Sequence, residues 1–152
     1  MTIEERRSTA IHEAGHVVVA WALDLPVGSM QIGCNGDDTA GRSEIDESAR
    51  QLSLIDRIAL CIAGVQAQLL FGCKSTHQHA GASDFGKIIE MLDGLSEDEA
   101  DTIRFKGYDR AAELLVCRRP LIERIAERLA ISGKLEQGGV LALLQEAEQQ
   151  SR

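Results

Sequence analysis

The sequence predicts a mainly helical α+β fold, with a small β-hairpin or sheet near the N-terminus and a bundle of helices toward the C-terminus. Three observations predict this fold. Apolar residues recur at helical spacing in several long segments. One short segment alternates between apolar and polar residues, as a strand does, and residues typical of helix ends stand between the segments. The length of 152 residues is that of about one domain.

The first third of the chain predicts one helix and two strands. A helix is expected over residues 8–23, and Pro26 lies just beyond it. Alternation over residues 29–34 predicts a strand, and residues 35–38 have the composition of a turn, so residues 39–45 are expected to return as a second strand. The apolar residues of the helix are Ile11, Ala14, Val17, Val18 and Trp21.

A second helix is predicted over residues 53–70, where Gly72 marks its end. The polar, small residues of segment 73–82 predict a loop, after which Ser83 or Asp84 would cap a third helix. The apolar stripe of the second helix consists of Leu54, Ile55, Ile58, Ile62 and Leu69.

Three more helices are expected in the C-terminal half. Ser96 with Glu99 forms a capping-box pattern for a helix that runs to about Cys117. Pro120 suits the first position of the next helix, and Gly138-Gly139 precede the last one.

Composition and charge exclude two classes of function. With 16 basic and 24 acidic residues the net charge is −8, so there is no excess of cations to bind a nucleic acid backbone. The longest stretch without charged residues, Ile58–Cys73, is shorter than the ~20 apolar residues of a membrane span. The N-terminus lacks the pattern of a signal peptide, so we expect a cytoplasmic protein. No C-x-x-C pair occurs, and the four cysteines, Cys34, Cys61, Cys73 and Cys117, are expected to be buried reduced thiols.

The chemistry is indicated by His12-Glu13-Ala14-Gly15-His16, an H-E-x-x-H pentapeptide within the first predicted helix. Helix geometry places His12 and His16 roughly 40° apart on adjacent turns, so that both imidazoles can reach one ion. Glu13 lies roughly 100° round from His12, beside the ion without being a ligand. Two imidazoles and a nearby base are typical of a zinc hydrolase.

A catalytic zinc requires a third protein ligand. The metzincin continuation is absent, because Val19 and Ala22 stand where that class has Gly and His. Among the other candidates Asp84 is favoured, although a simple helix cap would explain this residue equally well. Loop histidines are more often solvated than metal-bound. The candidates are Asp84, His77, His79 and Glu90.

Beyond the pentapeptide, the sequence resembles the zinc peptidase domain of the FtsH-type AAA proteases. The similarity extends over most of the chain and would make residues 1–152 a single zincin-like domain. In that domain residues 1–95 would hold the zinc site and residues 96–152 the C-terminal helices. The similar segments are Glu5–Trp21, Pro26-Val27, Ala40-Gly41, Asp56–Ala59, Ala63-Gly64, Leu70–Gly72, Gly81–Asp84 and Tyr108–Leu129.

The resemblance implies a role for each residue of the site. His12, His16 and Asp84 would bind one zinc per chain, and water would fill the fourth position. Glu13 would act as the general base that takes a proton from this water. Substrate peptide would lie along an edge strand near residues 30–34.

The sequence also departs from the family pattern. Asp84 follows Ser83 directly, where the family usually has one residue between the two. Gln66 and Gln68 stand where it tends to carry Ala and an acidic residue. No Walker A motif and no membrane segment occur in the chain.

We therefore predict an ATP-independent zinc metalloendopeptidase that acts on peptides or unfolded protein, with no nucleic acid or membrane partner. The alternative is a catalytically idle zinc-binding module that serves protein interaction or regulation. A homo-oligomer and docking to a separate ATPase both stay open. The substrate sequence preference is not predicted.

Overall fold

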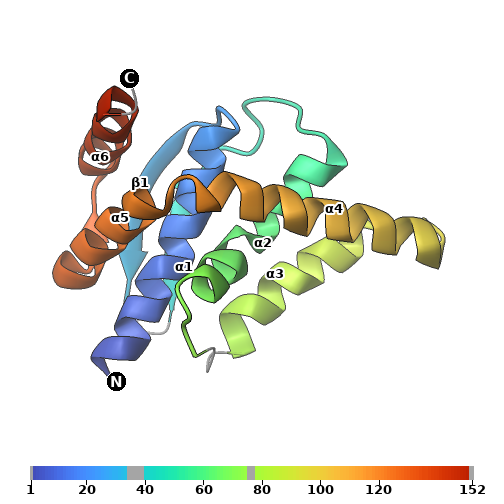
Figure 1. The fold of residues 1–152 in the computed structure, drawn as a ribbon, viewed down its shortest axis with the longest axis horizontal. Coiled ribbons are helices and arrows are strands. Elements are labelled where there is room, and N and C mark those ends of the chain that lie inside the picture. Colours follow the sequence, from blue (N-terminus) through green and yellow to red (C-terminus); the bar gives the residue numbers. More distant parts are fainter. Residues whose placement is uncertain (1, 34–39, 75–77, 151–152) are drawn as a thin grey trace.

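A computed structural model describes residues 2–33, 40–74 and 78–150, and these ranges contain six helices and a three-stranded sheet (Figure 1). The predicted mainly helical α+β class is confirmed. Within the same ranges, every helix is too short or too polar to cross a bilayer. The elements are α1 (Ile3–Ala22), β1 (Val27–Ile32), β2 (Gly41–Ile45), α2 (Leu54–Leu70), α3 (Gln78–Met91), α4 (Glu97–Val116), α5 (Arg119–Ser132), β3 (Lys134–Leu135) and α6 (Gln137–Gln150).

Helix α1 begins earlier than its apolar pattern predicts, at Ile3 instead of Ser8. A capping box holds this end: the Thr2 hydroxyl accepts from the Glu5 N–H, and the Glu5 carboxylate accepts from the Thr2 N–H, both at 3.0 Å. The apolar pattern misses the first turn because its side chains are largely exposed. The middle of the helix, by contrast, is buried on nearly all sides and forms the centre of the core.

The sheet has the order β2-β1-β3, and both pairings are antiparallel. Met30 and Ile32 are buried, as the alternating pattern predicts, while the predicted turn at residues 35–38 lies outside the described residues. Strand β3 was not predicted, because two residues are too few to show a pattern. Since β1 pairs on both sides, the prediction that residues 30–34 form an edge strand is wrong for its described part. The edge strand that packs against α1 is β2.

Helix α2 packs against α1 on one side and α4 on the other (Figure 1). Ser53 caps its start, as the predicted range implies, and accepts from the Asp56 N–H at 3.1 Å. Gly72, with φ 66°, follows its end. Leu69 is the exception in the predicted apolar stripe, because 64 % of this residue is exposed.

Helix α3 corrects the prediction of a loop over residues 73–82, because it begins at Gln78. Asp84 therefore lies inside the helix and does not cap it. The small residues 80–83 resemble a loop in composition, but nothing in them prevents helix formation. Asp84 and Ile88 are one turn apart, and both are buried.

The C-terminal helices begin close to the predicted positions. Ser96 accepts from the Glu99 N–H at 3.2 Å and so caps α4, and Pro120 stands in the first turn of α5. Gly138-Gly139 lie within the first turn of α6, where we expected them to precede it. Helix α5 packs on α1, and α6 packs on β1.

The cysteines divide by burial. Cys61 is buried, as predicted, Cys73 is half-buried and Cys117 is exposed, so the prediction of buried thiols is wrong for Cys117. Cys34 lies outside the described residues. The three described cysteines are free thiols.

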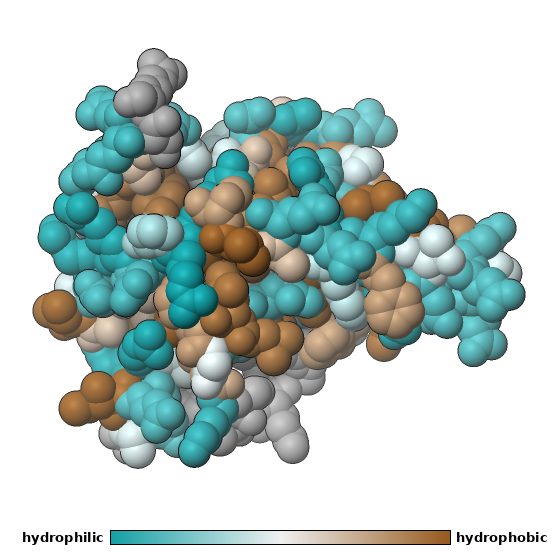
Figure 2. Space-filling view, viewed as in Figure 1, coloured by the Kyte–Doolittle hydropathy of each residue, from teal (hydrophilic) through white to brown (hydrophobic). Residues whose placement is uncertain are grey.

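Hydrophilic side chains cover most of the face shown in Figure 2, and hydrophobic ones gather near its centre. The large hydrophobic residues with the most exposure on the described chain are Ile3, Ile131, Ile89, Leu69, Val116 and Phe105. They are dispersed over different helices, as single exposed apolar side chains usually are.

Candidate metal centre

Helix α1 brings the two histidines of the pentapeptide together. His12 and His16 lie on adjacent turns, and their Nε2 atoms are 3.1 Å apart. His12 is almost fully buried, with 4 % exposed, and His16 is half-buried. The helical spacing, which predicted that both histidines can reach one ion, thus places the two Nε2 atoms close enough to bind the same ion.

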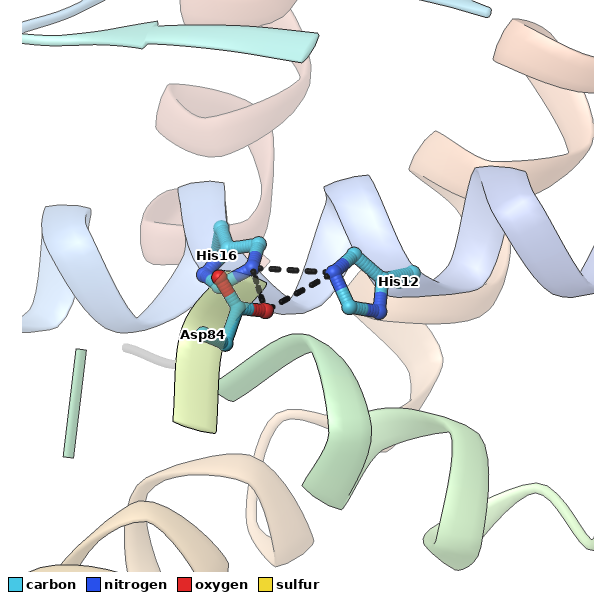
Figure 3. A group of neighbouring side chains, drawn as sticks. All are labelled: His12, His16 and Asp84. Carbon is cyan, nitrogen blue, oxygen red and sulfur yellow. Dashed lines mark hydrogen bonds and ion pairs between the residues drawn. The ribbon is translucent and has the colours of Figure 1, made fainter. Parts of the chain in front are cut away.

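Asp84 reaches the same point from α3 (Figure 3). Its Oδ2 lies 3.2 Å from the His12 Nε2 and 3.3 Å from the His16 Nε2. In a tetrahedral zinc site, bonds of about 2.0–2.1 Å separate the ligand atoms by roughly 3.3 Å. The three atoms therefore match the spacing of a metal site, although no metal is part of the structure.

The ring protons are assigned by the partners of the two Nδ1 atoms. The His16 Nδ1 lies 2.9 Å from the Leu60 carbonyl oxygen, which can only accept, so this nitrogen carries the proton. The His12 Nδ1 lies 3.1 Å from the Gln68 Oε1 and donates to it in the same way. When both rings are neutral, each presents its Nε2 lone pair to the other ring and to Asp84.

A positive charge, from a bound cation or a proton, would stabilise three electron-rich atoms that lie in contact. The Asp84 Oδ2 is buried, and among the described residues it has no hydrogen-bond partner with acceptable geometry. An orphaned buried carboxylate oxygen is costly unless it is paired. Two neutral imidazoles and one carboxylate are donors that zinc accepts. The residues present therefore fit a zinc ion.

The pKa shifts reflect the same clustering. Burial raises the pKa of Asp84, but the contacts with His12 and His16 lower it by more, to about 2. Burial lowers the pKa of His12, but Asp84, Glu13 and Gln68 together raise it by more, so the net shift is upward. The lowered pKa keeps Asp84 in its carboxylate form, and the raised pKa of His12 reflects the acidic groups around its ring.

Glu13 lies beside this group and is held by β2. The Ser43 hydroxyl donates to the Glu13 Oε2 at 2.6 Å. Gly41 lets the strand approach closely, because a Cβ at that position would come within 2.8 Å of the Glu13 Cγ. Glu13 is almost fully buried, and its second carboxylate oxygen, Oε1, accepts no hydrogen bond from the described residues.

Helix α2 packs against the ring of His12. A Cβ at Gly64 would lie 2.5 Å from the His12 Nε2, so only glycine leaves room for this ring. A Cβ at Gly15 would lie 2.6 Å from the Ala67 Cβ, so this glycine allows α1 and α2 to pack closely. The resulting groove has a volume of about 330 Å³. Its walls include the site residues, Gly41–Ser43 of β2, Leu60 and Cys61 of α2, and Lys87 of α3.

Of the other predicted ligands, Glu90 alone has a side chain that the structure describes. Glu90 is exposed on α3 and is not part of the cluster. His77 lies outside the described residues. His79 falls within α3, but the structure describes no side chains between residues 78 and 82. Asp84 is thus the favoured third ligand that the structure brings to the two histidines.

Sequence reasoning missed three supporting groups: Ser43, Gln68 and the Leu60 carbonyl. A serine or glutamine carries no signal of its own, and a backbone carbonyl carries none at all. Gln68 was visible only as a departure from an expected acidic residue. Each group lies at least 30 residues from its partner in sequence.

A larger cavity, of about 720 Å³, lies between the end of α1, the start of α5 and α6. Trp21, Leu121 and Leu143 are among its walls. It contains none of the metal-ligand candidates, so its size does not make it the functional site.

No model of a known protein family matches the chain. A curated relative is the ATP-dependent zinc metalloprotease FtsH 1 of Salinibacter ruber (strain M8), to which the chain is 26 % identical over 184 aligned residues. The chain is distantly similar to FtsH. The alignment covers 93 % of this chain but 27 % of the relative, so the chain spans about a quarter of the relative's length. The similarity supports a metallopeptidase-like relation.

Proposed function

We propose that this protein is a zinc-dependent metalloendopeptidase that hydrolyses peptides or unfolded protein. The observation that carries the proposal is the convergence of the His12 Nε2, the His16 Nε2 and the Asp84 Oδ2 within 3.3 Å, with Glu13 alongside. Three protein ligands with room for a fourth group are typical of catalytic zinc, whereas structural zinc has four protein ligands. A purely structural site would also have no use for a buried glutamate base.

When bound, zinc would supply a Lewis acid that polarises the scissile carbonyl and makes a nearby water more acidic. Glu13 is the residue suited to take the proton of that water, through its free Oε1. Ser43 holds the other oxygen, so the carboxylate keeps one orientation during the transfer. Glu13 can then pass the proton to the leaving amine.

The substrate fits best along β2. This strand pairs with β1 on one side, and no described strand pairs with its other side. Gly41, Arg42 and Ser43 also line the groove beside the metal ligands. An extended peptide can add to such an edge through backbone hydrogen bonds. Most peptide bonds of a folded protein are not available as a free extended segment, so unfolded chains should be cleaved and stably folded ones should resist.

The test uses the purified full chain loaded with zinc. We expect near one zinc per chain, cleavage of unfolded casein, and resistance of a stable folded protein. Glu13→Gln should keep the metal and lose cleavage by at least about 100-fold. Glu127→Gln, on the exposed face of α5, is the matched control and should behave like the unmodified chain.

Two results would decide against the peptidase. If the zinc-loaded protein leaves casein intact, the idle zinc-binding module becomes the better interpretation. If Glu13→Gln cleaves as fast as the unmodified chain, Glu13 is not the base.

A further inference from the structure

A chain of hydrogen bonds links the backbone of α1 to the ring of His12 through one side chain of α2. The Gln68 Nε2 lies 3.1 Å from the Ser8 carbonyl oxygen and 3.0 Å from the Ser8 Oγ. The Gln68 Oε1 lies 3.1 Å from the His12 Nδ1. Ser8 and His12 are one turn apart on α1, so Gln68 bridges two turns of the neighbouring helix.

The Ser8 carbonyl oxygen fixes which atom donates in each of these hydrogen bonds. The Ser8 carbonyl can only accept, so the NH₂ of Gln68 must face it and the Oε1 must face His12. That oxygen in turn can only accept, so the His12 Nδ1 carries the ring proton. The bare Nε2 then points to the His16 Nε2 at 3.1 Å and to the Asp84 Oδ2 at 3.2 Å.

We propose that Gln68 is a positioning residue for the metal: it holds His12 in the tautomer and orientation that present Nε2 as a ligand. Groups that accept from the far nitrogen of a ligating histidine commonly set its tautomer and raise its basicity. For His16 the Leu60 backbone carbonyl does this, and no substitution can remove it. Among the described residues, Gln68 is thus the side chain whose substitution can remove the acceptor of a ring Nδ1 proton.

The amide also sets the charge of the centre. Gln68 is neutral, so two imidazoles and the Asp84 carboxylate contribute a total charge of −1. A carboxylate at position 68 would accept from the His12 ring equally well and would add a second negative charge. A divalent cation should then bind at least as tightly.

The inference rests on the proposed function only in taking His12 as a metal ligand, and peptide hydrolysis plays no part in it. The measurement is therefore the zinc affinity of the purified full chain, by competition with a chelating dye. Gln68→Met keeps the length of the side chain and removes the acceptor, and we expect zinc to bind 10- to 100-fold more weakly. Gln68→Glu restores the acceptor and should bind zinc at least as tightly as the unmodified chain.

Gln66→Met is the matched control. Gln66 lies on the same helix, is half-buried like Gln68 and makes no hydrogen bond that the described residues show. Its substitution should leave the zinc affinity unchanged. Melting of each variant with chelator present shows whether it folds.

A second readout does not depend on affinity. Long-range ¹H–¹⁵N spectra of the zinc-loaded protein should show His12 protonated at Nδ1, with a slowly exchanging proton. In Gln68→Met that proton should exchange rapidly, whereas a role in packing alone would leave it unchanged. This readout also serves if Gln68→Met folds poorly, because Gln68→Glu should preserve the slow proton.

The outcomes separate the two proposals. If Gln68→Met binds zinc as tightly as the unmodified chain and keeps the slow proton, the positioning role is wrong. If His12→Ala also retains full zinc affinity, the metal centre itself is misplaced and the inference falls with it. If zinc affinities follow the expected order but no peptide is cleaved, Gln68 keeps its role and the proposed peptidase does not.

Discussion

At the scale of single residues, the candidate site depends on short-range contacts that fix proton positions. The Nε2 atoms of His12 and His16 can serve as ligands because both Nδ1 atoms donate to acceptors. Glu13 is held equally firmly, with one oxygen on Ser43 and its side chain against Gly41. The arrangement leaves one oxygen of Glu13 for a proton transfer.

Replacing Ser43 tests whether the orientation of Glu13 matters. We expect Ser43→Ala to lower kcat about 10-fold, because a hydrogen bond to a charged group contributes about 1.5–3 kcal/mol. Zinc content should not change, since Ser43 touches no ligand. Ser43→Thr keeps the hydroxyl and should recover most of the rate.

Ser29→Ala is the control for that experiment. Ser29 lies on β1, and its hydroxyl donates to the exposed Glu44 at 2.9 Å. An equal loss of kcat in this variant would point to a general effect on the sheet. An unchanged kcat in Ser43→Ala would mean that Glu13 needs no such support.

The buried thiol of Cys61 gives a test that depends on pH. Burial raises the pKa of this thiol to about 11, so very little thiolate is present near pH 8. We expect iodoacetamide to modify the exposed Cys117 first, and labelling of Cys61 to increase as the pH rises toward 11. Peptide mapping by mass spectrometry measures both rates.

The raised pKa of Cys61 also makes the stability of the fold depend on pH. The unfolded thiol loses its proton near pH 8.5–9 and the folded one near 11, so this contribution to stability is complete below about pH 8.5 and is lost as the pH rises from there to about 11. Rapid labelling of Cys61 at pH 8 in folded protein would contradict the observed burial.

At the scale of the elements, the site depends on how closely α1 and α2 approach each other. Gly15 allows this approach, since a Cβ there would lie 2.6 Å from the Ala67 Cβ and 2.7 Å from the Ala63 carbonyl oxygen. Helix α2 then carries the Leu60 carbonyl, Gly64 and Gln68 to the two histidines. Helix α3 adds Asp84 (Figure 3).

We expect Gly15→Ala to lower the free energy of unfolding by about 1–3 kcal/mol, because an overpacked interface must shift. The same shift should weaken zinc binding, since it moves α2 away from the ligands. Gly86→Ala in α3 is the control. A Cβ there meets nothing within 4 Å, so the change should be neutral or stabilise by up to about 1 kcal/mol.

Urea denaturation of the two variants measures the difference. If Gly15→Ala were as stable as Gly86→Ala, the interface of α1 and α2 could accommodate an extra methyl group. A destabilised Gly15→Ala that binds zinc normally would separate packing from the site.

At the scale of the whole molecule, the candidate metal ligands come from elements that are distant in sequence. His12 and His16 belong to α1, and Asp84 belongs to α3, with α2 between them in the chain. A metal bound by all three holds the folded state and has no equivalent partner in the unfolded chain. Its binding energy should therefore appear as thermal stability.

We expect zinc at about 100 times its Kd to add about 2.7 kcal/mol to the free energy of unfolding. For a chain of this length that corresponds to a rise in Tm of roughly 5–10 °C, which a chelator should reverse. Calorimetry with and without zinc measures the effect. Asp84→Asn should abolish most of it, and Glu90→Gln, an exposed residue of the same helix, should not.

The sequence by itself determined most of the elements and the pair of candidate ligands on one helix. Apolar spacing and caps such as Ser53 and Ser96 are local signals, and the spacing of His12 and His16 is a property of the helix itself. The start of α3 and the central place of β1 were predicted incorrectly, because composition did not reveal a helix at residues 78–83 and pairing is a long-range choice.

Only the tertiary structure decided what surrounds the two histidines. Asp84, Gln68, Ser43 and the Leu60 carbonyl reach the site from elements that are 30 or more residues away in sequence. Their contacts depend on the approach of helices and strands that α1 does not specify. The pentapeptide therefore predicts the kind of chemistry, whereas the proton positions on the two histidines and the candidate third ligand, Asp84, follow from packing.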